Sequence, residues 1–347
     1  YKKLNMSLKN LSVKIKIPRV LKNKLNNNKI GQIYKKFAKS LSVDKDFIVA
    51  VSGGPDSLAL AFFSKIYSIK KKLKVKYYII DHKLRTGSTA EAKYIKKILS
   101  RFYINAEILN WQGKKPKKNI QSLARSKRFE LLLMKAQKFG INDILLGHHQ
   151  GDLFENFFIR IIRGSGLKGL ISLGKKTKFN NVTILRPLIN QKKEDLVFIS
   201  KKVFDFYVKD PSNDDENFQR VRIRKLLKGL KNDGLDQKKF INTIKNLKKS
   251  NDVIDYYVNK NLKVNTFFSI KENQLILNDE FFKQPYEIVF RSLSHSLGFV
   301  SKKYYPVRGK KIDKIINDIQ KSSFYKSTLG SCLIEKVNQT VIISKEH

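Results

Sequence analysis

Residues 47–57 read Phe-Ile-Val-Ala-Val-Ser-Gly-Gly-Pro-Asp-Ser, and this stretch decides the fold. The apolar run over residues 47–51 predicts a short buried strand. Gly53 and Gly54 follow it and let the backbone turn tightly. Helical periodicity over residues 57–70 indicates a helix directly after the turn. A helix that begins at such a turn presents unpaired N–H groups and a partial positive charge to an anion.

The turn itself carries further groups that suit an anion. Ser52 and Ser57 add hydroxyl donors, although the spacing is not the GxxxxGK(S/T) of a Walker loop. A carboxylate beside phosphates would repel them, so a bridging Mg²⁺ is the simplest explanation for Asp56. The alternative is a turn that binds nothing. We expect an anion-binding loop made of Ser52, Gly53, Gly54, Pro55, Asp56 and Ser57.

The alternation of strand and helix continues outward from this loop. Further strands are predicted at residues 75–80, 105–111 and 143–146, and helices at 89–103, 119–139 and from about 152. This order is typical of an α/β fold with a parallel sheet covered by helices on both faces. Ligands of such sheets bind beyond the carboxyl ends of the strands, where the loop over 52–57 lies.

The rest of the chain differs in pattern. Residues 1–30 are rich in Lys and Asn and predict a basic arm, so the nucleotide-binding domain is placed at 31–232. A Lys-rich helical linker is expected over 233–262. Short strands and two helices predict a small α+β domain over 263–347.

Composition restricts the classes of partner. Lys and Arg number 72 against 29 Asp and Glu, a formal net charge of +43. Such an imbalance favours a polyanion, nucleic acid first, although compositional drift of a whole proteome is an alternative. The single cysteine, Cys332, excludes an internal disulfide, a cysteine zinc cluster and a CxxC pair. No apolar run approaches a membrane span or a secretory signal, so we expect a soluble cytoplasmic protein.

A second group of chemically active residues follows Gly147. An apolar stripe predicts the core-facing side of a helix, and it consists of Leu153, Phe154, Phe157, Phe158, Ile161 and Ile162. Asp152 and Glu155 fall on the other face, three residues apart, and can converge on one cation such as a lysine ammonium or Mg²⁺. A solvated helix face is the alternative, but His148 at the preceding strand end favours a site.

Two sets of arginines suit phosphate or carboxylate oxygens. Arg125 and Arg128 share one face of the helix over 119–139. Arg220, Arg224 and Lys228 are spaced by four and form a basic stripe, which suits the phosphates of RNA. The apolar residues opposite this stripe are Ile223, Leu226, Leu227 and Leu230. Ordinary surface arginines of a basic protein are the alternative.

These segments together resemble one known family. Ser52–Ser57 resembles the signature of the PP-loop ATP pyrophosphatase superfamily, and further segments resemble, in order, those of tRNA(Ile)-lysidine synthetases. They are Asp81-His82-Lys83-Leu84-Arg85 with Ser88 and Glu91-Ala92, then residues 119–129, 146–156 and 160–170, Arg186-Pro187-Leu188, residues 210–213 and residues 220–224. The resemblance spans about residues 30–230 and implies an adenine-nucleotide α hydrolase-like fold.

The resemblance also implies an activity. Members use ATP to adenylate the wobble cytidine of an isoleucine tRNA with a CAU anticodon, and free L-lysine then displaces AMP to give lysidine, with pyrophosphate as the other product. ATP and Mg²⁺ would bind at residues 52–57, with Asp56 as the metal ligand. The positions matching His148, Asp152 and Glu155 are associated with lysine. The arginines at 125, 128, 220 and 224 would contact phosphate, lysine or tRNA, and the linker and tail would hold the tRNA.

This chain departs from the family pattern at a few positions. Gly151 stands where the family usually has an Asp, Leu153 and Asn156 replace Gln and Thr, and Val221 replaces Asn. Two rival functions follow. A tRNA thiolation enzyme generally needs paired cysteines or an iron–sulfur cluster, and the single Cys332 argues against it. A non-catalytic tRNA-binding relic is favoured by Gly151 and opposed by the intact loop and Asp152.

Overall fold

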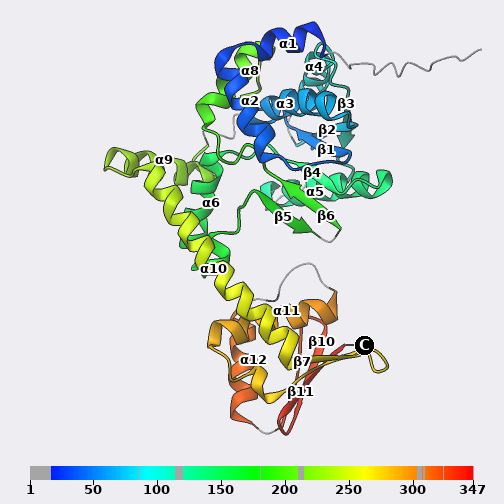
Figure 1. The fold of residues 1–347 in the computed structure, drawn as a ribbon, viewed down its shortest axis with the longest axis vertical. Coiled ribbons are helices and arrows are strands. Elements are labelled where there is room, and N and C mark those ends of the chain that lie inside the picture. The colour runs from blue at the N-terminus through cyan, green and yellow to red at the C-terminus, as the bar shows by residue number, and fades with distance from the viewer. Residues whose placement is uncertain are drawn as a thin grey trace, which may run out of the picture. The chain divides into compact units, whose positions relative to one another are not determined.

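The computed structural model describes residues 17–84, 86–113, 120–179, 181–209, 215–302, 307, 309–322 and 324–346. The chain divides into two compact units between Leu235 and Asp236 (Figure 1). Among the described helices, none has both the length and the apolar composition needed to span a membrane.

The first unit is built on a six-stranded sheet in the order β3-β2-β1-β4-β6-β5. Its strands are β1 (Phe47–Val51), β2 (Val75–Asp81), β3 (Ala106–Asn110), β4 (Asp143–Leu145), β5 (Lys176–Phe179) and β6 (Val182–Leu185). All neighbours pair in parallel except β5, which runs antiparallel to β6 at one edge. The predicted parallel sheet is confirmed, and its central strand is the one that leads into Ser52–Ser57.

Helices cover both faces of this sheet. The helices of this region are α3 (Pro55–Lys71), α4 (Ser88–Ser100), α5 (Ile120–Phe139), α6 (Gln150–Ile162), α7 (Leu167–Leu170), α8 (Lys193–Phe204) and α9 (Gln219–Asn232). Helices α3, α4 and α8 pack on one face of the sheet and α5 on the other. Alternate residues of β1 enter opposite cores, because successive side chains of a strand point to opposite faces. Phe47, Val49 and Val51 pack with α3 and α8, whereas Ile48 and Ala50 pack with α5.

The expected basic arm over residues 1–30 is wrong for its second half. Helices α1 (Arg19–Leu25) and α2 (Asn28–Ser40) occupy this region, and Leu21 and Ile30 are buried in the core beside α3. The cause is an apolar stripe within a Lys-rich segment, since Ile30 is followed by Ile33, Tyr34 and Phe37 at helical spacing. Residues 1–16 lie outside the described part of the chain.

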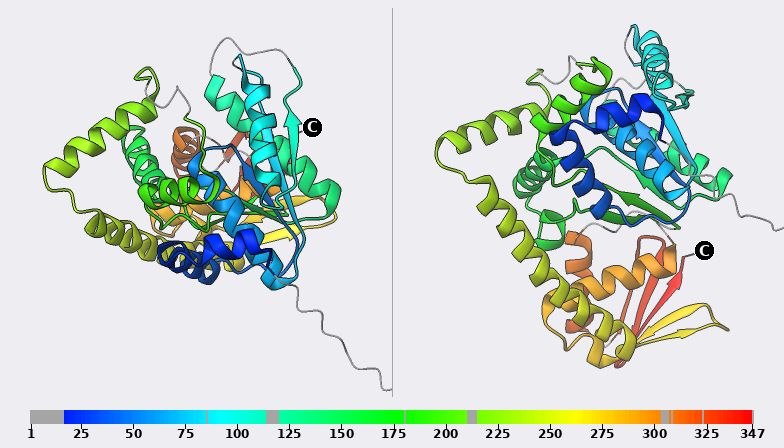
Figure 2. Two further views of the ribbon diagram at one scale, coloured as in Figure 1. Left: turned by 90° about the horizontal axis from the view of Figure 1, so that it is seen from above. Right: turned by 45° about the horizontal axis from the view of Figure 1, so that its top comes forward.

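The second unit is a small α+β domain, as expected. A five-stranded antiparallel sheet has the order β7-β8-β11-β10-β9, with α11 (Tyr286–Ser301) and α12 (Gly309–Lys321) packed on it (Figure 2). The strands are β7 (Thr266–Ser269), β8 (Gln274–Leu277), β9 (Phe324–Leu329), β10 (Cys332–Val337) and β11 (Thr340–Lys345), and a short 3-10 helix spans Asp279–Phe281. Cys332 is fully buried in this core.

The long helix α10 (Gln237–Asn265) is fixed to α11 by a buried cation. The Arg291 side chain donates to Asn251 Oδ1 at 2.6 Å, Asp255 Oδ1 at 3.1 Å and Glu287 Oε1 at 2.7 Å. Only 4% of that side chain is exposed. The C-terminal half of the helix expected as a linker over 233–262 is therefore packed into the second unit.

Candidate active site

The loop Ser52–Ser57 joins β1 to α3 and is held in shape by one hydroxyl. Ser57 Oγ accepts from the Ser52 backbone N–H at 3.1 Å and from Ser52 Oγ at 3.2 Å, and it donates to the Gly54 carbonyl at 2.9 Å. Gly53 has φ +80°, which only glycine adopts without strain, and Val208 N–H donates to its carbonyl at 2.9 Å. The Ser57 hydroxyl is therefore used in hydrogen bonds within the loop. The main anion-binding feature of the loop is the amino end of α3.

A second glycine brings β4 against this loop. A Cβ on Gly147 would lie 3.0 Å from the carbonyl carbon and oxygen of Asp56 and from the Ser57 nitrogen. These are backbone atoms that cannot easily move aside. The absence of a side chain at 147 therefore lets the segment with His148 and His149 lie directly against the phosphate-binding loop.

His149 stands between the loop and α6. Its Nδ1 accepts from the Gly151 backbone N–H at 2.9 Å, and its own backbone N–H donates to Asp152 Oδ2 at 2.8 Å, so the residue caps α6. Its Nε2 lies 3.7 Å from Asp152 Oδ2 and 3.9 Å from Asp56 Oδ2. Asp56 and Asp152, predicted from two separate motifs, therefore both lie close to the same ring nitrogen.

Asp56 has a cationic partner that the sequence did not indicate. Lys193, the first residue of α8, donates through Nζ to Asp56 Oδ2 at 2.5 Å. Ser200 on the same helix donates to the Pro55 carbonyl at 2.7 Å, so α8 is tied to the loop at two points. A basic residue at the start of a helix is too common to be singled out from sequence alone.

The other oxygen of Asp56, Oδ1, is buried and has no hydrogen-bond partner among the described residues. No group of three or more His, Cys, Asp or Glu in the described part of the chain could hold a metal ion. Mg²⁺ is usually bound by one or two carboxylates together with substrate phosphates, and not by a cage made of protein alone. This donor set therefore fits Mg²⁺ brought in with a nucleotide.

The two carboxylates of α6 differ in their acidity. Burial would raise the pKa of Asp152, but His149, His148 and the backbone N–H of His149 outweigh it, so its pKa is lowered. Burial raises the pKa of Glu155 to about 7, and the charge of Asp152 adds to this effect. At neutral pH Asp152 is ionised, whereas Glu155 is poised between its two forms. Such a pair can attract a cation and accept a proton from it.

His148 is the third predicted member of this group. Burial, together with the charges of Arg186 and Arg125, lowers its pKa to about 4 against the opposing charge of Asp152. Its Nδ1 is buried and has no hydrogen-bond partner among the described residues. The ring is therefore neutral at physiological pH and suits hydrogen bonding to a ligand better than it suits taking up a proton.

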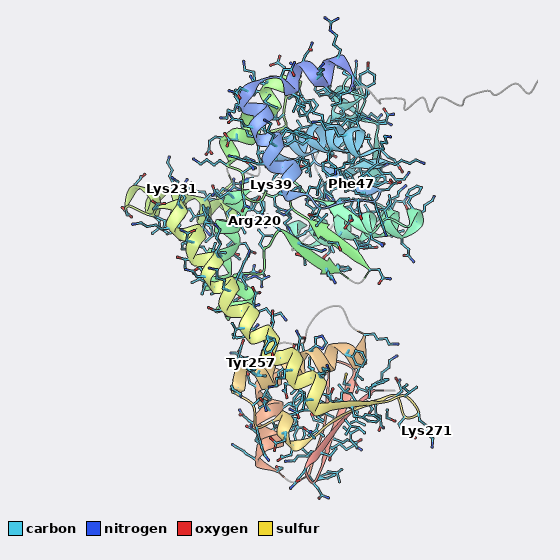
Figure 3. All side chains as sticks on the ribbon, in the orientation of Figure 1. Lys39, Phe47, Arg220, Lys231, Tyr257 and Lys271 are labelled. Atoms are coloured by element: carbon cyan, nitrogen blue, oxygen red, sulfur yellow. The ribbon has the colours of Figure 1, made fainter. Side chains whose placement is uncertain are left out.

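Two arginines of α9 act on the carboxylates of Asp152 and Glu155. Arg224 Nε lies 3.4 Å from Glu155 Oε1, and the charge of Arg220 acts on both Asp152 and Glu155. Arg220 is labelled on α9, which packs against α6 (Figure 3). Arg220 and Arg224, expected to contact phosphate, lysine or tRNA, are therefore the members of the stripe that act on these carboxylates, and their contacts with substrates stay a prediction. Lys228 lies further along α9 and is exposed.

Arg186, which the family motif contained without an assigned role, is also part of this surrounding. It is 5% exposed and donates through Nη1 to the Gly174 carbonyl at 3.1 Å and to Thr177 Oγ1 at 2.8 Å. Burial and the charge of Arg125 lower its pKa to about 10, against the attraction of Asp152. Arg125, predicted from the sequence as a site residue, therefore acts electrostatically on the Arg186 guanidinium. Arg128 lies near His82, whose pKa burial and this charge lower to about 4.

The predicted faces of α6 are only partly right. Leu153, Phe154 and Phe157 are buried, but Ile161 and Ile162 are 48% and 60% exposed, and Glu155 is buried although it was placed on the outer face. The stripe drifts around the helix, because a spacing of eight or nine residues does not return to the same face of a 3.6-residue turn. Glu155 lies on the face of α6 that the apolar periodicity predicts to be exposed. Helix α9 packs over α6 and buries Glu155 on this face.

The strand end at β2 is fixed by its last carboxylate. Asp81 is 3% exposed and accepts from Lys83 N–H at 2.9 Å, Ser88 Oγ at 2.8 Å and Thr89 Oγ1 at 2.5 Å. His82 packs edge-on against Trp111. The family-matched Arg85 and residues 210–213 lie outside the described residues.

Comparison with known proteins agrees with this arrangement. Residues 23–230 match the PP-loop domain family. The tRNA(Ile)-lysidine synthase of Orientia tsutsugamushi (strain Boryong) is 34% identical over 313 residues, which cover 86% of this chain and 69% of that protein. The tRNA(Ile)-lysidine synthase of Wolbachia sp. subsp. Brugia malayi (strain TRS) is 31% identical over 307 residues, which cover 86% and 70%.

A solved structure shares the fold. The U34-tRNA thiolase of Methanococcus maripaludis superposes with a TM-score of 0.54 at 18% sequence identity, over 64% of this chain and 78% of the thiolase. Identity at this level indicates a common architecture and leaves the chemistry to be argued from the residues of the site.

Proposed function

The chain belongs to the tRNA(Ile)-lysidine synthase family, and from this membership we propose how its residues join free L-lysine to a tRNA. The enzyme is an AMP-forming ligase that makes a carbon–nitrogen bond at the wobble cytidine of an isoleucine tRNA with a CAU anticodon. ATP first adenylates the cytidine and pyrophosphate leaves. The side-chain amine of lysine then displaces AMP and loses a proton, which gives lysidine.

The first step uses the loop Ser52–Ser57. Its backbone N–H groups and the amino end of α3 bind the phosphates of ATP, and Asp56, whose Oδ1 has no hydrogen-bond partner among the described residues, would hold Mg²⁺ brought in with them. The metal, when bound, neutralises charge on the phosphates. Lys193, now paired with Asp56, is placed to turn toward the departing pyrophosphate.

The second step uses α6. Asp152, which stays ionised, attracts the lysine ammonium, and Glu155 accepts the proton that the amine must lose before it attacks. A base whose pKa is near 7 is well matched to this task at neutral pH. His148, which is neutral, half-buried and near Asp152, donates a hydrogen bond to the substrate or accepts one from it.

The tRNA itself is held by basic surfaces. The exposed lysines of α9 bind backbone phosphates, and the second unit, with its Lys-rich helix α10, provides further contacts. Arg125 and Arg128 bind phosphate or carboxylate groups at the mouth of the site. We place the enzyme in the cytoplasm, where ATP, lysine and tRNA occur together.

One observation carries the proposal: the ATP loop and the lysine-binding helix meet at His149, whose Nε2 lies within 4 Å of both Asp56 Oδ2 and Asp152 Oδ2, at 3.9 and 3.7 Å. The test separates the two steps. Purified enzyme is given CAU isoleucine tRNA and ATP, and pyrophosphate is measured without and with lysine. Asp56→Ala should abolish pyrophosphate release, while Asp152→Asn should retain it and require at least tenfold more lysine for lysidine formation.

An exposed acidic residue of the same unit provides the control. Asp44→Ala should leave both steps unchanged, because Asp44 is exposed at the far end of β1. Wild-type enzyme that binds tRNA but releases no pyrophosphate would instead support the non-catalytic relic. Thiolation is disfavoured by the names of the relatives and by the burial of the single Cys332 in the core of the second unit.

A further inference from the structure

The side chain of His149 is longer than a helix cap requires. Ser, Thr, Asp and Asn are the residues that ordinarily cap a helix, since a short side-chain oxygen is enough. His149 fills this position with a ring that is only 8% exposed. Its second nitrogen extends beyond the cap and reaches the two carboxylates of neighbouring motifs. The extra length of the side chain therefore has a use other than capping.

The hydrogen bonds of the ring fix what the second nitrogen can do. Because Nδ1 accepts from Gly151 N–H, the neutral ring carries its proton on Nε2. That proton points toward Asp152 Oδ2 at 3.7 Å and Asp56 Oδ2 at 3.9 Å. Both distances exceed a hydrogen bond, so the ring lies between two acceptors and is bound fully to neither.

Gly151 makes this ring position possible. A Cβ at residue 151 would lie 2.7 Å from His149 Cε1 and 3.0 Å from Nδ1. A side chain there would push the ring out of its place. The glycine that departs from the family pattern is thus the residue that allows His149 to lie between Asp56 and Asp152.

We propose that His149 is a positioning residue that couples the ATP site to the lysine site. The inference rests on the proposed function, which assigns Asp56 to ATP and Asp152 to lysine. A nucleotide and its Mg²⁺ at Asp56 Oδ1 would reduce the negative charge on Oδ2, so this carboxylate would compete less for the Nε2 proton. His149 then donates to Asp152 alone and fixes its orientation for the lysine ammonium. Nucleotide binding therefore tightens lysine binding, and lysine tightens nucleotide binding by the same factor.

The test measures binding and not turnover. Isothermal titration calorimetry gives the dissociation constant of lysine without and with a saturating non-hydrolysable ATP analogue and Mg²⁺. We expect the analogue to tighten lysine binding by about fivefold or more in the wild type. The reciprocal titration of the analogue, without and with lysine, should give the same factor.

Two variants separate coupling from capping. His149→Asn keeps a good capping acceptor but is too short to reach Asp56, so it should retain the thermal stability of the wild type and lose the coupling. Gly151→Ala leaves His149 in the chain but displaces its ring, which removes both the approach to Asp56 and the cap on the Gly151 N–H, while alanine favours the helix, so the thermal stability of this variant is measured beside its coupling. The control is His295→Asn, an exposed histidine of the second unit.

The outcomes are distinct. Coupling lost in both α6 variants at unchanged thermal stability supports the proposal. Equal lysine affinity with and without the analogue in the wild type overturns it, and so does full coupling in His149→Asn, while the proposed function stands in either case. Failure of the wild type to bind lysine under any condition overturns the proposed function, and this inference with it.

Discussion

Arg224 and Glu155 face each other across α9 and α6, with Nε 3.4 Å from Oε1. The pair is asymmetric, because 40% of the Arg224 side chain is exposed and only 11% of the Glu155 side chain is. Solvent screens the guanidinium, so its attraction only partly offsets the cost of burying the carboxylate. Glu155 is therefore left with a pKa of about 7, although a cation lies next to it.

The first prediction concerns the base that deprotonates lysine. With Glu155 in this role, kcat/KM for lysine should fall about tenfold per pH unit below pH 7, since only the ionised form accepts a proton. The measurement is lysidine formation at limiting lysine between pH 5 and pH 9. Glu155→Gln should remove this acidic limb together with most of the activity. A limb near pH 4 would point instead to His148, whose pKa is about 4.

The second prediction concerns Arg224. Its positive charge lowers the pKa of Glu155, so Arg224→Ala should move the acidic limb to higher pH. The comparison variant is Arg222→Ala on the same helix, because Arg222 is exposed and donates to the carbonyl groups of Glu216 and Asn217. That variant should keep the wild-type limb. The same limb in wild type and Arg224→Ala would show that Arg224 does not lower the pKa of Glu155.

The third prediction is a gain of stability. A carboxyl whose folded pKa lies above its unfolded value binds more protons when folded, so its contribution to stability is lost as pH rises from about 4.5 toward 7. Glu155→Gln should therefore stabilise the first unit by up to about 3 kcal/mol at pH 8 and by less than about 1 kcal/mol at pH 5. Urea denaturation at both pH values measures this. Exposed Glu194→Gln is the control, and a gain that is equal at both pH values would contradict the assignment.

The fourth prediction concerns the close approach at Gly147. Ala at this position would press on the backbone of Asp56 and Ser57, so Gly147→Ala should weaken binding of an ATP analogue by at least tenfold. Gly229 in α9 is the matched control, since a Cβ there meets nothing within 4 Å. Gly229→Ala should leave ATP binding intact and stabilise the helix by about 1 kcal/mol or less. Equal nucleotide affinity in both variants would argue against the packing of β4 on the loop.

The fifth prediction divides the basic residues of α9. Lys228 and Lys231 are exposed and lie further along α9 than Arg220 and Arg224. Replacing both lysines by Ala should weaken tRNA binding and should lower the slope of log Kd against log salt concentration by about one to two. The affinities of this double variant for ATP and for lysine should stay unchanged. An unaltered salt dependence would mean that this end of α9 does not contact the tRNA.

Much of the first unit was predictable because its signals are local. The apolar run over 47–51, the glycines after it and the periodic helices that follow each specify one element, and their alternation implies a parallel sheet. The strands β5 and β6 were missed. Lys176 and Lys178 make the edge strand β5 largely polar, and β6 is only four residues long. The place of β6 in the sheet depends on its pairing with β4, which lies about 40 residues earlier in the sequence.

The site was predictable as a set of residues but not as a geometry. Asp56, Asp152, Glu155 and His148 could be named from their motifs, whereas the raised pKa of Glu155 results from α9 packing over α6. Lys193 had no local signal, since its role is defined by a contact with a residue 137 positions earlier. Ile30, Ile33 and Phe37 did carry a helical spacing, which the Lys-rich composition around them obscured.

The pairing of Lys193 with Asp56 can form only late in the synthesis of the chain, because both residues must first be made. The two residues are 137 positions apart, so at roughly 5 to 20 residues per second Asp56 is made about 7 to 27 seconds before its partner. Strand β4, which leads to Gly147, is likewise made long after the central strand β1 that it pairs with. A ribosome-bound chain that ends before α8 therefore has the complete nucleotide motif without the helix that fixes it, and ATP binding is acquired late in translation.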